Sequence, residues 1–189
     1  MNRLGSSIHL VKALPAAYER PLLIKQLLTA NLAFFGIYHL SCGSQKLRMR
    51  RTVCLEPESG ITSLATFHFC HTNIVPLLFN CGVLATLGSS HLVHMGASHF
   101  ASVYFGSCAA GAVFAAWDMR SNPNQTQAGG MAGSAGLIAY HAMRNKHWFR
   151  AGFTPMMALG GMLLYGMVYD DKAALGGTSA GFAAFLLAL

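Results

Sequence analysis

Six apolar segments separated by short loops account for most of this chain of 189 residues. The hydrocarbon core of a bilayer is about 30 Å thick, and a helix needs roughly 20 apolar residues to cross it, or about 17 when it stands upright. The expected spans cover residues 22–40, 73–91, 100–117, 128–143, 149–168 and 173–189. The sequence therefore predicts an all-α membrane protein, a six-transmembrane-helix bundle.

The amino-acid composition agrees with this class. Hydrophobic residues make up 53% of the chain and charged residues only 10%, whereas about a quarter of the residues in a soluble domain are charged. The loops between the spans are brief, and none is long enough to form a soluble domain. We expect one membrane domain over residues 22–189, preceded by a distinct N-terminal segment over residues 1–21.

The charge pattern favours a membrane surface over a nucleic acid as the partner. The net charge is +7, but the basic residues fall in short runs between apolar segments, as is typical of contacts with lipid headgroups. The densest run, KLRMRR, contains Lys46, Arg48, Arg50 and Arg51. We interpret it as a solvated loop that contacts anionic lipid, with a cardiolipin or protein contact as the sharper alternative.

The first 21 residues suggest a cellular location. They carry Arg3, Lys12 and Arg20 among serines and apolar residues, and Glu19 is their only acid. This pattern suits a mitochondrial address better than a secretory signal, although no cleavage site is evident. The expected location is the mitochondrial inner membrane, with the orientation left open because the basic residues divide almost evenly between the two sides.

No metal or other cofactor is predicted. Five cysteines are scattered singly without a CxxC pair, so the sequence encodes neither a disulfide framework nor a zinc site. His68 and His71, with Cys70 between them, are interpreted as hydrogen-bonded interface residues. A second group comprises His91, His94 and His99. We expect these three to contact headgroups or a partner, since their spacing fits no metal or haem motif.

Glycines indicate which helices pack most closely. Because helices in lipid gain little from hydrophobic pairing, small residues that let backbones approach are their main means of association. Gly177 and Gly181 share one face of the sixth span at a spacing of four residues, and Gly133 and Gly136 lie in the fourth. These two spans are expected to pack together.

Five fragments, in order and at the right spacings, resemble the rhomboid intramembrane serine proteases. They are TANLAFFGIY, FHFCHTNIVPLLFN, SHFASVYFGSCAAG, MAGSAGLIAY and YDDKAALGGTSAG, and the match that they mark out extends over most of the chain from Leu22 onward. They are most similar to the mitochondrial, presenilin-associated rhomboid-like branch. The resemblance implies a rhomboid-like bundle whose chemistry comes from a serine and a histidine buried in the membrane.

Both positions of that dyad are altered here. The family's nucleophile is the third residue of GxSG, and the corresponding run GSAG places Ala135 there, with Gly133 and Gly136 aligned. The family's histidine lies three residues before the first glycine of GxxxG in the sixth helix, which corresponds to Ala174. The resemblance therefore implies a catalytically inactive member.

The oxyanion site is altered as well. The family pattern on the second helix is HxxxxHxxxN, and this chain has His71, then Pro76, then Asn80, so one hydrogen-bond donor is lost. Ser134 is not expected to replace the nucleophile, because it is rotated by about 100° from the motif position. It also lacks a base, since no histidine follows His147. His71, Asn80 and Ser134 are thus interpreted as remnants.

These observations lead to a function without catalysis. We expect an accessory structural subunit of a mitochondrial inner-membrane complex, such as a respiratory complex or ATP synthase. The expected partners are membrane lipids, including cardiolipin, and other subunits of that complex. The alternative is non-catalytic binding of transmembrane clients in a protein translocase or a quality-control pathway. An active protease is the third hypothesis.

Overall fold

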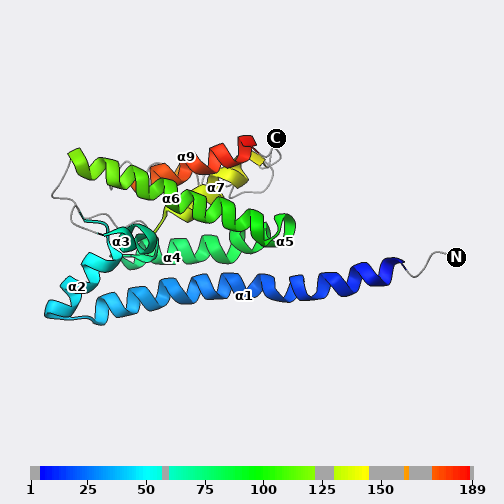
Figure 1. Cartoon of the computed structure of the whole chain (residues 1–189), viewed down its shortest axis with the longest axis horizontal. Coiled ribbons are helices and arrows are strands. Elements are labelled where there is room, and N and C mark those ends of the chain that lie inside the picture. Colours follow the sequence, from blue (N-terminus) through cyan, green and yellow to red (C-terminus); the bar gives the residue numbers. More distant parts are fainter. Residues whose placement is uncertain (1–4, 57–59, 122–129, 145–159, 162–171, 188–189) are drawn as a thin grey trace.

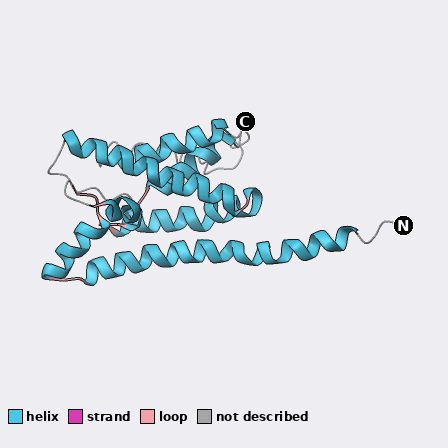
Figure 2. Cartoon of the chain, viewed as in Figure 1, coloured by secondary structure: helices cyan, strands magenta, loops and turns pink. Residues whose placement is uncertain are grey.

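The computed structural model describes residues 5–56, 60–121, 130–144, 160–161 and 172–187, and within them the chain is helical and contains no strand (Figures 1 and 2). The first helix, α1 (Gly5–Leu40), runs without a break through the boundary that was expected after residue 21. Its first part extends beyond the other helices, as the blue end of the ribbon in Figure 1 shows.

The basic run forms a helix, α2 (Gly43–Val53), so the prediction of a loop is wrong. Lys, Leu, Arg and Met are all good helix formers, and Arg50 and Arg51 lie in the last turn, where positive charge is favourable. Two short elements follow, α3 (Ile61–Thr66) and the 3₁₀ turn η1 (Phe67–Phe69). The hydroxyl of Thr66 donates a hydrogen bond of 2.9 Å to the carbonyl of Thr52, which ties α3 to α2.

The second expected span is a continuous helical run that extends to Met95 rather than to residue 91. It consists of α4 (Ile74–Val83), one π-helical turn, η2 (Leu84–Gly88), and α5 (Ser89–Met95). Gly96 then adopts a positive φ of 87°, which a residue without a β-carbon reaches at little cost. The chain therefore reverses at one residue, and α6 (Ala97–Ser121) starts directly after it.

Among the described helices, two are long and apolar enough to cross a membrane, namely Ile74–Met95 and Ala97–Ser121. The next helix, α7 (Ala132–Arg144), has 13 residues and is only about 20 Å long. Its residues from Ala132 to Ala142 are all buried, so its length is not set by contact with lipid. The fifth expected span lies almost wholly outside the described residues, and the count of six spans stays a prediction.

The last helix, α9 (Lys172–Leu187), packs on α6 and α7 through glycines. A β-carbon on Gly177 would collide with the backbone of Ala132, and one on Gly181 with the backbone of Gly136. Gly176 faces α6 in the same way, because its β-carbon would lie 2.8 Å from the carbonyl oxygen of Ala110. Helix α9 therefore meets both α6 and α7 backbone to backbone, and the three helices together form the centre of the bundle.

Candidate functional site

Four buried polar side chains from distant parts of the sequence meet beside this centre. They are Asn31 of α1, His71 from the segment before α4, Asn80 of α4 and Ser134 of α7, and none of them is more than 2% exposed. Buried polar groups in an apolar bundle are costly unless they are hydrogen-bonded. The four residues meet this requirement by bonding to one another.

Asn31 is the hub of this network. Its side-chain nitrogen donates to the carbonyl of Leu27 at 2.8 Å, which leaves its Oδ1 as the acceptor for the other residues. Nδ2 of Asn80 and Nε2 of His71 each lie 2.9 Å from that oxygen. Because Oδ1 only accepts, His71 carries its proton on Nε2 and a lone pair on Nδ1.

The free face of the His71 ring is covered by the chain that leads into α7. A β-carbon on Gly130 would lie 2.5 Å from Nδ1 of His71, so only glycine fits over the ring. Nδ1 has no hydrogen-bond partner among the described residues. His71 is thus fixed in one tautomer by Asn31 and closed in by Gly130.

Ser134 joins the network through Asn80. Its hydroxyl donates a short hydrogen bond to Oδ1 of Asn80. A serine becomes a strong nucleophile when a base takes its proton in the transition state, and an amide oxygen is not such a base. In this arrangement the Ser134 proton is held by Asn80, and the hydroxyl links α7 to α4.

The two alanines that the family resemblance aligns with the dyad are part of the apolar core. Ala135 and Ala174 are 0% and 1% exposed, and both belong to the main cluster of buried hydrophobic residues. Pro76 is the third residue of α4, where its missing N–H costs no helical hydrogen bond. The side chains at these three positions are hydrocarbon, so none of them can act as a nucleophile, a base or a hydrogen-bond donor.

Two features of the site were not found from the sequence. Asn31 was missed, although an amide within an apolar span is a recognisable signal for a buried polar contact. Gly133 was expected to pack on the sixth span, but a β-carbon there would meet the ring of Tyr104 in α6. Tyr104 is 1% exposed and lies beside the network.

A second polar network contradicts the prediction for His91, while the prediction for His99, which is only partly buried, stays open. His91 is 0% exposed, and its Nδ1 lies 3.2 Å from Nε2 of His141, while its Nε2 lies 2.8 Å from Nδ1 of His99. The hydroxyl of Tyr140 lies 3.4 Å from Nε2 of His99. His91 lies in the first turn of α5, and its side chain points into the bundle. It therefore joins α5 to α6 and α7 and does not contact headgroups.

These histidines do not form a metal centre. The two ring nitrogens of His91 face different neighbours, His141 and His99. The nitrogens of the three rings therefore do not converge on one point where an ion could bind. No group of three or more metal-binding side chains occurs in the described part of the chain.

The four basic residues of α2 lie on its exposed surface, but they differ in their contacts. Nε of Arg50 forms a salt bridge of 2.5 Å with Glu56, and the ammonium of Lys46 lies 5.4 Å from the centre of the Tyr38 ring. Arg48 and Arg51 are exposed and extend the positive surface. These two are the better candidates for a contact with lipid or with another subunit.

Fold and network together define a helical integral membrane protein with a buried polar site. The model of the Rhomboid domain family matches residues 58–189, which is well over half of the chain. The chain therefore belongs to the rhomboid family, whose members are normally proteases. No curated protein and no solved structure matches it.

Proposed function

We propose that this chain is a catalytically inactive rhomboid protein whose bundle serves as a scaffold in a larger membrane assembly. The observation that carries the proposal is the hydrogen bond from Ser134 to Asn80, which commits the one hydroxyl of the GSAG run to an amide oxygen. Ala135 and Ala174 at the positions aligned with the dyad support the same conclusion. The members of such a dyad act as a unit, so loss of either removes most of its rate.

The assembly that we propose is a complex of the mitochondrial inner membrane, such as a respiratory complex or ATP synthase. The basic, acid-poor segment before residue 22 supports the mitochondrial address. Large apolar side chains on the exposed surface, such as Leu32 and Ile37 of α1, provide area that other subunits or lipids could cover. Cardiolipin and neighbouring subunits are the proposed contacts of Arg48 and Arg51.

The absence of catalysis predicts that serine-directed probes do not react. Protein reconstituted in liposomes should show only background labelling with a fluorophosphonate, since the Ser134 hydroxyl donates to an amide oxygen and not to a base, and Ala135 has no hydroxyl. The measurement is in-gel fluorescence, with an active rhomboid protease in the same liposomes as the positive control. Labelling that disappears in Ser134→Ala would show that this serine is an active nucleophile and would overturn the proposal.

The scaffold role predicts one stable assembly. Affinity purification of the tagged chain should recover one large complex, and Arg48→Gln combined with Arg51→Gln should lower that recovery severalfold without unfolding the bundle. Arg50 is left unchanged because its salt bridge with Glu56 belongs to the fold. Lys25→Gln, an exposed change on α1, is the matched control.

Depletion of the chain distinguishes the scaffold role from the client-binding alternative. If depletion of the chain leaves every inner-membrane complex at its normal level, and instead changes the import or lifetime of individual membrane proteins, the scaffold role fails. Client binding then takes its place.

A further inference from the structure

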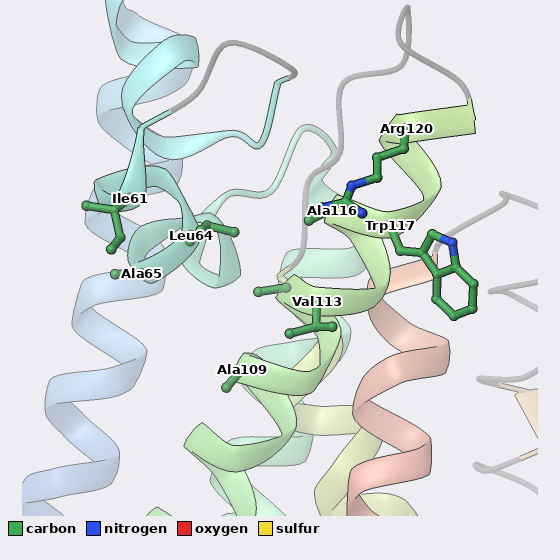
Figure 3. Close-up of a pocket in the computed structure, with 9 residues that line it drawn as sticks. Ile61, Leu64, Ala65, Ala109, Val113, Ala116, Trp117 and Arg120 are labelled. Carbon is green, nitrogen blue, oxygen red and sulfur yellow. The ribbon is translucent and has the colours of Figure 1, made fainter.

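An apolar groove lies between α3 and α6, outside both polar networks (Figure 3). Its volume is about 630 Å³, and every residue that lines it is apolar except Arg120. Ile61 of α3 forms one side, and Ala109 and Val113 of α6 form the other. Ile61 is 84% exposed and Val113 is 65% exposed, so the groove opens to the surroundings of the protein.

The groove runs along the end of a candidate membrane span. Arg120 and Trp117 lie in the last two turns of α6, and this end of α6 is at the same end of the bundle as α2 and α3 (Figure 1). Tryptophan and arginine near the end of a span are typical of the membrane–water interface. The groove therefore leads from the hydrocarbon region, near Ala109, to the headgroup region, near Arg120.

Arg120 supplies a positive charge at the upper end of the groove. It is exposed, and no salt bridge joins it to a residue in the described part of the chain. Its side chain turns toward Ala116, while the Trp117 indole projects to the other side of α6 (Figure 3). A guanidinium in this position can donate two parallel hydrogen bonds to two oxygens of one phosphate.

We propose that this groove binds one acyl chain of an anionic phospholipid, with the lipid phosphate on Arg120. The apolar lining favours a hydrocarbon chain, and the single charge at the interface favours the anionic headgroup. A protein helix, about 10–12 Å wide with its side chains, is the competing occupant, and the experiment below distinguishes it from a lipid. This inference does not depend on whether the chain is catalytic.

Quenching of a tryptophan placed in the groove tests the proposal, because the Trp117 indole itself projects to the other side of α6. The chain has two tryptophans, which Trp117→Phe and Trp148→Phe remove, and Leu64→Trp then places a single reporter on the α3 side of the groove. The protein is reconstituted in vesicles of unlabelled phosphatidylcholine. A brominated lipid is then added in increasing mole fraction, either brominated phosphatidylglycerol or brominated phosphatidylcholine. Brominated phosphatidylglycerol should reach half of its maximal quenching at about a fivefold lower mole fraction, as one interfacial arginine contact implies.

Matched variants separate the charge from the groove. Arg120→Gln should abolish the preference for phosphatidylglycerol, Arg120→Lys should keep most of it, and Lys25→Gln, an exposed change on α1, should leave it unchanged. Ala109→Leu should lower the preference by filling the groove while Arg120 stays in place. Ala97→Leu, at the exposed opposite end of α6, should have no effect.

Two results would overturn the proposal. The first is equal quenching by the two lipids in the parent protein, or a preference that survives Arg120→Gln. The second is protection of the tryptophan at position 64 from both brominated lipids by a protein that co-purifies and crosslinks to α3 or α6, because the groove would then be a protein-binding surface.

Discussion

Replacing Gly181 with leucine is expected to prevent the bundle from accumulating in its folded form. A β-carbon at this position would collide with the carbonyl of Gly136, and it would lie 2.8 Å from that residue's α-carbon. Backbone atoms cannot turn aside as a flexible side chain does, so α9 would have to separate from α7. Overpacking a core by a few methylenes already costs about 1–3 kcal/mol, and this change should cost more, a large part of the roughly 5–15 kcal/mol that stabilises a typical domain.

The measurement is the amount of protein in the membrane and its thermal unfolding in detergent. Gly106→Leu on α6 is the matched control, because nothing lies within 4 Å of the β-carbon that would be added there. Gly177→Leu should behave like Gly181→Leu, since its β-carbon would meet the backbone of Ala132. If the variants at positions 181 and 106 accumulate equally well, the packing of α9 on α7 described above is incorrect.

Restoring the dyad alone is expected to restore little or no protease activity. In the variant that combines Ala135→Ser with Ala174→His, Pro76 still occupies the position that the family resemblance assigns to one of the oxyanion donors. Loss of one such donor lowers kcat by about 10²–10³-fold. Adding Pro76→His should therefore raise cleavage of a transmembrane substrate in liposomes by about that factor over the double variant.

Controls in the triple variant assign any activity that appears. Reverting the new serine to alanine should abolish cleavage, and Asn80→Ala should reduce it, because Asn80 would be the remaining side-chain donor. Robust activity in the double variant would mean that the oxyanion is stabilised by another route. No gain from Pro76→His would mean that position 76 does not face the reacting carbonyl.

Hydropathy and the spacing of residues within one helix were enough to predict the class of this protein and one packing face. They predicted an integral membrane protein of helices, and the family resemblance predicted its rhomboid domain. They also placed Gly177 and Gly181 on one face of their helix, because a spacing of four residues is a property of a single helix. The helix α2 was missed, since a charged segment between two spans has the composition of both a loop and a surface helix.

Tertiary structure alone decided which helix faces met. Asn31 lies 40 residues from His71 and 49 from Asn80, and His91 lies 50 from His141, so no local pattern specifies those contacts. The groove below Arg120 likewise arises only where α3 lies against α6. The sequence by itself thus determined the class of protein and the small residues that permit close packing. The polar networks and the groove required the fold, because they depend on how separate helices are rotated and placed against one another.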